Sequence, residues 1–209
     1  MEIIAKSNGS GNGYDPVPAG NYVARCFSMV HIGTVPEEYQ GEVKMQNKVR
    51  ITWELPTETK VFKEENGEQP YVLSKEFTLS MHEKSTLRKW LESWRGKAFT
   101  QAESDGFDVA KLIYAPCMLN VIHKEKKDGQ IRADIASVSA MPKGLECPKA
   151  INLPVLFSVN EFDQKVFDTF PDFLKDKIRS SKEYKAMQQP NATETPAIPQ
   201  NEPEDDLPF

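Results

Sequence analysis

The chain has 209 residues, 39% of them hydrophobic, which is enough to bury one core and still leave residues for extensions. No apolar run approaches the roughly 20 residues that span a bilayer, and the start lacks the pattern of a signal peptide, so we expect a cytoplasmic protein with no membrane partner. Five of the 31 acidic residues lie in residues 188–209, which have no Lys or Arg. The body before them is therefore neutral, with 26 acids and 26 bases. This balance excludes a broadly basic surface but permits a local basic groove.

The first part of the chain predicts a flexible arm followed by three strands. Residues 1–13 are rich in Gly, Ser and Asn, as flexible linkers are. Residues 21–33 are rich in aromatic and β-branched residues, and residues 47–55 alternate between apolar and polar. Residues 71–80 form a third strand, in which Lys75 falls in phase with the apolar positions; a bulge would explain this irregularity.

After the third strand, the spacing of the apolar residues changes from the two-residue period of a strand to the 3.6-residue period of a helix. Ser80 and Glu83 have the spacing of a capping box, and Leu and Trp residues follow at helical intervals as far as Gly96. This pattern predicts an amphipathic helix over residues 81–95. A shorter helix is expected over residues 107–113.

Two further strands are predicted around a tight turn. Residues 116–124 and 131–140 flank the Asp128-Gly129 dipeptide, which is typical of hairpin turns. Three strands, a helix and two strands are the element order of the OB-fold, a five-stranded barrel. We therefore predict a mainly β protein with helices, in which residues 14–145 form an OB-fold domain with its helix between strands three and four.

The rest of the chain predicts a helical extension and a tail. Residues 146–187 form the extension, and the apolar residues from 158 to 187 indicate two short helices broken at Pro171. Residues 188–209 are rich in Pro and acids and poor in apolar residues, which predicts a disordered acidic segment.

An OB-fold binds extended oligomers across strands two and three, with the loops that join strands one to two and four to five as clamps. Single nucleic-acid strands are held by basic side chains at phosphates and by aromatic rings that stack on bases. Residues of these kinds lie in the expected elements and are candidate ssDNA-binding residues: Arg25, Tyr39, Lys44, Lys48, Arg50, Lys124, Lys126, Lys127 and Arg132. For each single residue, a solvated surface position is an equally good explanation.

Further aromatic and basic residues have simpler explanations. All three tryptophans fall in phase with apolar neighbours, so we expect core packing rather than base stacking for Trp53, Trp90 and Trp94. Lys84, Arg88 and Arg95 form a basic stripe on the predicted helix 81–95 that could bind phosphates or an acidic tail. A solvated helix face is the favoured explanation of this stripe.

Indications of catalysis or a metal site are few. The histidines lack the spacing of a metal-binding helix: His31, His82 and His123. The cysteines have no metal or disulfide pattern, so we expect reduced and largely buried thiols at Cys26, Cys117 and Cys147. We expect a non-enzymatic protein with no catalytic residue, no metal and no cofactor, and keep a metal-dependent nuclease as a weaker alternative.

The sequence ends in EDDLPF, where acids precede an apolar residue, Pro and a terminal Phe. Phe209 combines an apolar ring with a free carboxylate, and a pocket with an apolar floor and a basic rim can hold both. The pattern predicts a hook for partner proteins made of Asp205, Asp206, Leu207, Pro208 and Phe209. A solubility tail would explain the acids but not the Leu-Pro-Phe end. The acids also predict that the tail competes with DNA for a basic groove.

EDDLPF resembles the acidic tip of bacterial single-stranded DNA-binding proteins. The body, with MHEKSTLRKWLESWRGKAFT and IASVSAMPKG, resembles a bacteriophage single-stranded DNA-binding protein of the OB-fold type over roughly residues 14–187. The resemblance implies sequence-independent coating of single strands in DNA replication, recombination and repair, with enzymes recruited through the tip. The simplest bacterial proteins of this family lack the helical extension at 158–187. This difference leaves the oligomeric state open between monomer and dimer. An OB-fold adaptor that binds proteins rather than DNA is the alternative.

Overall fold

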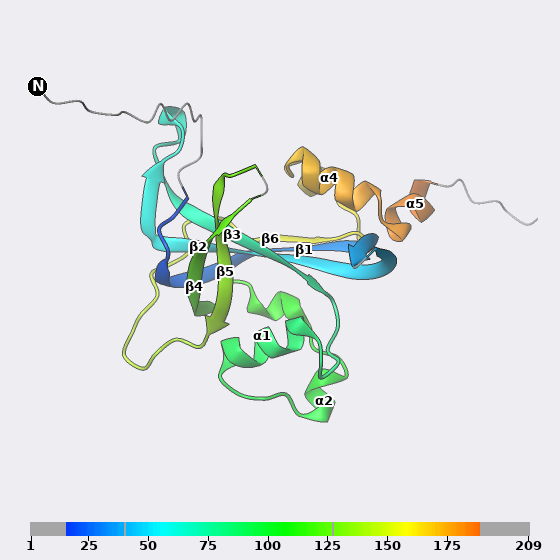
Figure 1. Cartoon of the computed structure of the whole chain (residues 1–209), viewed down its shortest axis with the longest axis horizontal. Helices are drawn as coiled ribbons and strands as arrows, with labels where there is room; N and C mark the ends of the chain where they lie inside the picture. Colours follow the sequence, from blue (N-terminus) through cyan, green and yellow to red (C-terminus); the bar gives the residue numbers. More distant parts are fainter. Residues whose placement is uncertain (1–15, 40, 127, 189–209) are drawn as a thin grey trace, which may run out of the picture.

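A computed structural model describes residues 16–39, 41–126 and 128–188, and in it six strands form one sheet (Figure 1). Five strands pair antiparallel in the order β3-β2-β1-β4-β5, and β6 pairs parallel with β1. The strands are β1 (Gly20–Tyr39), β2 (Glu42–Val61), β3 (Glu68–Thr78), β4 (Pro116–Glu125), β5 (Ile131–Ser139) and β6 (Val155–Ser158). The predicted arm and all of the predicted tail except Gln188 lie outside the described residues.

The hairpin of β1 and β2 is longer than the sequence pattern predicted. Each strand has 20 residues, and the ladder continues through the predicted loop to the pair Tyr39↔Glu42. Val43 and Met45 of β2 are exposed there, so no buried face imposes an alternation of apolar residues on this part of β2. The backbone ladder extends the strands where the sequence carries no periodic pattern.

The main core combines the inward side chains of β1 to β5 with the helix α1 (Thr86–Arg95). The apolar face of β2 is buried as its alternation predicted, and Trp53 is fully buried with its ring centroid 5.6 Å from that of Trp94. Trp90 is only partly buried against this core and contacts Phe77 at 5.0 Å between centroids. The predicted core packing is therefore confirmed for Trp53 and Trp94 and holds in part for Trp90.

The cysteines are free thiols, and two of them are buried in this core. Burial raises the pKa of the Cys26 thiol to about 12 and that of Cys117 well above its ordinary value. Cys147 is half-buried. The predicted burial is confirmed for Cys26 and Cys117.

The helix α1 begins later than predicted, because Ser85 caps it by accepting a hydrogen bond from the Arg88 backbone N–H at 3.1 Å. The expected capping box at Ser80 and Glu83 is wrong, since the Ser80 hydroxyl accepts instead from the His82 N–H. A capping box does precede the short helix α2 (Gln101–Ser104), where Thr100 and Glu103 bond reciprocally. In place of the predicted helix 107–113, the chain forms a 3₁₀ turn, η2 (Val109–Leu112). Another 3₁₀ turn, η1 (Glu64–Asn66), lies between β2 and β3.

The two edges of the five-strand path, β3 and β5, approach each other without backbone pairing between described residues. Lys75 spans the gap, because its Nζ donates to the Ile135 carbonyl at 2.6 Å. The bulge suggested at Lys75 is absent: it pairs in register with Ile51, and the register shift between β2 and β3 lies between Leu55 and Thr59. The fold is thus a mainly β, barrel-like arrangement whose sheet is not closed.

The extension packs on the opposite side of the β1–β2 hairpin from α1 and α2 (Figure 1). The extension contains β6, which its sequence pattern did not predict, and three helices in place of the two expected: α3 (Gln164–Asp168), α4 (Asp172–Arg179) and α5 (Lys182–Gln188). The predicted break at Pro171 is confirmed, since Pro171 is the N-cap of α4. A second core, which includes Val30, Ile32 and Phe157, joins these helices to β1.

Gly33 lies where α5 meets β1, and the close packing there requires glycine. Its φ is 96°, and an added Cβ would lie 2.9 Å from atoms of Val159 and Ser181. The Glu183 carboxylate accepts hydrogen bonds from the Thr34 backbone and hydroxyl, both at 2.7 Å. Among the described helices, none is long and apolar enough to cross a bilayer.

Candidate nucleic-acid interface

Arg50 lies on the outer face of β2, as the alternation predicted, but beneath α4. Its guanidinium donates to Glu76 at 3.1 Å and lies over the Phe173 ring at 5.2 Å. Lys177 of α4 contacts both Glu76 and Glu37 at 2.7 Å. Arg50 is thus part of an ion-pair network that fastens α4 to the sheet.

The contacts of this network favour the charged forms of Lys177 and Glu37. The hydrogen bond from Lys177 lowers the pKa of Glu37 below 4.5. Burial by itself would lower the pKa of Lys177, but the hydrogen bonds to Glu37 and Glu76 raise it above 10.5. The two basic groups and the two acids of the network compensate one another, so little positive charge remains for a ligand.

Arg25 is committed to backbone carbonyls. Its guanidinium donates to Tyr114 at 2.6 Å, and to Cys147 and Pro148 at 2.9 Å each. Beside it, the buried Glu54 carboxylate accepts from the backbone N–H groups of residues 151 and 152 at 2.8 Å each. These two side chains hold the segment before β6 against the sheet, which is a structural role for Arg25.

The predicted clamp at the β1–β2 turn lies beneath α5 and away from the β4–β5 hairpin (Figure 1). Lys44 is exposed and forms an ion pair with Glu42 at 2.9 Å. Tyr39 ends β1 opposite Glu42. The structure therefore does not bring these two candidates near the candidates on β4 and β5.

The β4–β5 hairpin carries exposed basic residues near the edge of β3. Lys124 forms an ion pair with Asp134, Lys126 donates to Gln130 at 3.3 Å, and Arg132 has no ion-pair partner within the described ranges. Lys127 lies outside the described residues. Lys124 and Arg132 are directly opposite in the ladder, so their charges lie close together.

Asp134 connects this hairpin to β3. One carboxylate oxygen lies 3.6 Å from Lys75 Nζ, and the other contacts Lys124. Burial by itself raises the pKa of Asp134, but the Lys124 hydrogen bond and the Lys75 charge lower it below 3.8 overall. Lys75 Nζ also lies 4.8 Å from the centre of the Trp90 ring. Two lysines from different strands therefore share one carboxylate at the gap in the sheet.

A cavity of about 520 Å³ opens at the same edge of β3, and we call it the lysine cavity. Its basic residues come from β2, β3 and the segment before α1: Lys48, Lys75, His82 and Lys84. The hydroxyl groups of Ser80 and Thr86 add donors, whereas those of Thr78 and Ser85 already donate to Gln46 and to the Ser80 carbonyl. Its one acidic lining residue is Glu76, which Arg50 and Lys177 already neutralise.

Two lysines of this cavity, Lys48 and Lys84, are less committed to protein groups than Arg25 and Arg50, whereas Lys75 is held by Ile135 and Asp134. Lys48 Nζ makes a long contact of 3.4 Å to the Thr78 hydroxyl. Lys84 is exposed and has no ion pair in the part of the chain that the structure describes. Ammonium groups and hydroxyls around a solvent-filled hollow are suited to the oxygens of a phosphodiester.

Two members of the lysine cavity did not emerge from the sequence as binding residues. Lys75 was noted only as an irregularity in β3, although a lysine at an inward position has to find acceptors, here Asp134 and Ile135. Lys84 belonged to a predicted helical stripe, but it precedes α1, while Arg88 and Arg95 bond to Glu92 and Glu103. The stripe is therefore divided, and only Lys84 faces the lysine cavity.

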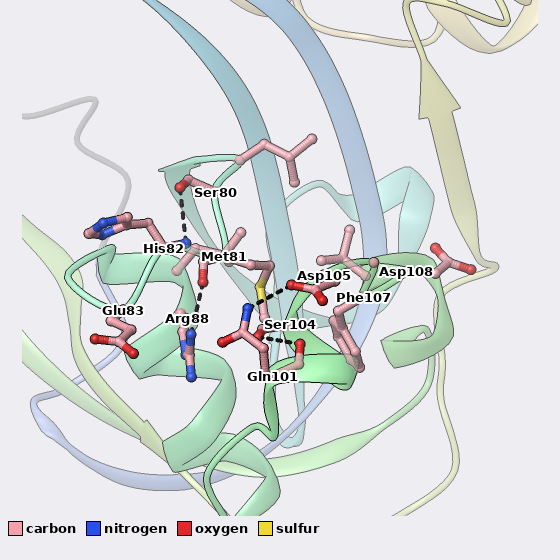
Figure 2. A pocket seen from close by; sticks show the side chains of 14 residues that line it. Ser80, Met81, His82, Glu83, Arg88, Gln101, Ser104, Asp105, Phe107 and Asp108 are labelled. Carbon is pink, nitrogen blue, oxygen red and sulfur yellow. Dashed lines mark hydrogen bonds between the residues drawn. The ribbon is translucent and has the colours of Figure 1, made fainter.

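A second cavity, of about 810 Å³, lies on the other side of the segment from Ser80 to His82. Figure 2 shows its side chains, with Gln101 and Asp105 pointing toward each other and Phe107 beside them. Ser80 and His82 line both cavities, so they form a common wall. We call this second hollow the amide cavity, after Gln101.

Within the described residues, no group of three or more His, Cys, Asp or Glu side chains could hold a metal ion. A comparison with known proteins finds neither a family model nor a curated protein that matches the chain. A function for this surface is therefore argued from its geometry.

Proposed function

We propose that the protein is a sequence-independent single-stranded DNA-binding protein whose strands form an OB-type barrel. The strand order β3-β2-β1-β4-β5 is that of an OB barrel opened between its third and fifth strands, and α1 lies between β3 and β4 in the chain. The side chain of Lys75 spans this opening. The open edge provides a place for a strand of nucleic acid to lie.

The observation that carries the proposal is the gathering of lysines at one edge of a neutral body. Lys48, Lys75 and Lys84 line one cavity, and Lys75 shares Asp134 with Lys124 of the neighbouring hairpin. A track from the β4–β5 hairpin to the start of α1 can hold successive phosphates. We leave Arg25 and Arg50 out of this track because protein groups already occupy their donors.

The proposed role is to coat single strands during DNA replication and recombination in the cytoplasm of a host cell. The hook at Asp205, Asp206, Leu207, Pro208 and Phe209 would recruit partner enzymes; these residues lie outside the described part of the chain. The proposed chemistry is binding without catalysis.

A protein-binding adaptor is the second candidate, and the aromatic residues favour it. Stacking on bases needs exposed rings, but Phe77 is buried and Trp90 lies beneath the Lys75 ammonium. An adaptor would use the same barrel and hook while the lysine cavity received acidic groups of a protein.

The test is binding of a fluorescent oligo-dT at two salt concentrations by the full-length protein and by the variant K48E/K84E. We expect affinity to fall tenfold or more, and the slope of log affinity against log salt to fall by about 1 to 2 as phosphate contacts are lost. The control K143E/K165E makes the same charge change at two exposed lysines outside the lysine cavity. Equal loss in both variants would contradict the placement, and no binding by the unmodified protein at low salt would favour the adaptor.

A further inference from the structure

We infer that the amide cavity receives a nucleobase of the bound strand and prefers bases that carry an amino group. This inference rests on the proposed function, because it takes the neighbouring lysine cavity as the phosphate site. The two cavities share Ser80 and His82, so a nucleotide with its phosphate on one side of this wall can place its base on the other.

The size and apolar lining of the amide cavity suit a flat aromatic ligand. Its volume of about 810 Å³ falls within the roughly 300–1,000 Å³ of small-molecule sites. Met81, Leu87 and Phe107 supply apolar surface, and the half-buried Phe107 ring is held by an edge contact with Phe99 at 4.8 Å. Thioether and aromatic groups pack well against the faces of bases.

One pair of polar side chains, Gln101 and Asp105, presents acceptors to the cavity. The Gln101 amide donates to one carboxylate oxygen of Asp105 at 2.7 Å, which orients both side chains. Gln101 Oε1 and the second Asp105 oxygen accept no hydrogen bond from any described residue. Cytosine and adenine present an amino donor to such acceptors, whereas uracil and thymine present a carbonyl at the equivalent position.

The charge of the amide cavity separates it from the phosphate site. Its carboxylates are those of Glu83, Asp105 and Asp108. Its guanidinium, from Arg88, is committed to Glu92 at 3.1 Å and to the carbonyls of residues 81 and 99. A phosphate is therefore repelled from this cavity and attracted to the lysine cavity, which orients the nucleotide across the shared wall.

The experiment compares binding of oligo-dC and oligo-deoxyuridine by the full-length protein and its variants. Cytosine and uracil differ only in the groups at positions 3 and 4 of the ring. Deoxyuridine is used instead of thymidine so that no methyl group is added to the comparison. We expect the unmodified protein to favour oligo-dC by about fivefold or more. The variant Q101A/D105A should lose this preference by weakening oligo-dC binding and leaving oligo-deoxyuridine binding unchanged.

A matched control exists on α3, where Gln164 donates to Asp168 at 2.8 Å with the same spacing of four residues. The variant Q164A/D168A removes an equivalent pair outside the cavity and should keep the preference. Equal affinities of the unmodified protein for the two oligomers, or an equal loss for both in Q101A/D105A, would overturn the inference.

Two further results separate this inference from the function on which it rests. Strand binding that depends on Lys48 and Lys84 but shows no base preference would overturn the inference and leave the proposed function standing. A basic peptide is used as a second probe, because the acceptors of the amide cavity could bind basic groups of a protein instead of a base. If Q101A/D105A weakened binding of this peptide and left oligo-dC binding unchanged, the inference would be overturned. Absence of any strand binding would overturn both.

Discussion

Basic side chains occupy two neighbouring regions of the sheet, the outer face beneath α4 and the edge of β3. On the outer face, Arg50 and Lys177 meet Glu37 and Glu76 at 2.7 to 3.1 Å. At the edge, the lysine cavity contains one acid, Glu76, which belongs to the outer network. Similar residue types therefore stabilise the fold in one region and remain accessible to a ligand in the other.

The difference between the regions comes from what covers them. The outer face receives α4, whose Leu174 and Ile178 are buried, and an ion pair beneath such a helix needs a partner for each charge. The edge of β3 has no pairing strand among the described residues, and beside it Lys84 is exposed and Lys48 is half-buried. Accessibility and the absence of paired acids, rather than the number of basic residues, distinguish a candidate binding site.

The largest expected effect is at Gly33, where the extension meets the outer face. G33A should lower the free energy of unfolding by about 3 kcal/mol or more, because it adds backbone strain and contacts at 2.9 Å with Val159 and Ser181. Denaturant unfolding measures this. G129A is the control, since Gly129 also has a positive φ of 78° but no atom within 4 Å, and it should cost only about 1 kcal/mol. Equal losses would show that close packing at Gly33 is unimportant.

The next effect tests the two regions directly through DNA binding. R50A should change the affinity for oligo-dT by less than about twofold, because the donors of Arg50 are occupied by Glu76, whereas K48E/K84E should lower it about tenfold or more. Fluorescence anisotropy at one low salt concentration measures both. A loss in R50A as large as that in K48E/K84E would remove the distinction between the two regions.

A smaller effect is expected when the outer network is broken. K177A leaves Glu37 and Glu76 without their shared cation, and it should lower the free energy of unfolding by about 1 kcal/mol while leaving DNA affinity unchanged. Urea unfolding and oligo-dT titration of the same preparation test this. A K177A protein of unchanged stability but weakened DNA binding would place Lys177 in the interface.

The smallest effect is the pH dependence of the docking of α5. Burial by itself raises the pKa of Glu183, but the hydrogen bonds from Thr34 lower it, and overall it lies below 4.5. Its stabilisation is therefore complete above about pH 4.5 and is lost as the pH falls through the lowered pKa. The protection factors of α5 amides, which are corrected for the intrinsic pH dependence of exchange, should fall in that window, and E183Q should show low protection at neutral pH as well. If the protection factors of E183Q still rose as the pH was raised through the window, the effect would belong to another carboxylate, such as Glu37.

The sequence by itself determined those elements whose pattern comes from one buried face. The alternation of β2 and the Leu and Trp residues of α1 each identify an element, because burial on one side imposes a period on local residues. The turn between β4 and β5 is identified by a different local signal, the Asp128-Gly129 dipeptide, in which Gly129 has a positive φ of 78°. The terminal EDDLPF also stands out from composition and order alone. It remains a prediction outside the described residues.

Only the tertiary structure decided which basic residues are free. Arg50 and Lys48 are two residues apart on the same face, yet Arg50 lies under α4 and Lys48 lines the lysine cavity. The acid that neutralises Arg50 is on β3, and the carboxylate shared by Lys75 and Lys124 is on β5. Strand pairing and helix docking between distant segments set these distances, and local periodicity carries no information about them.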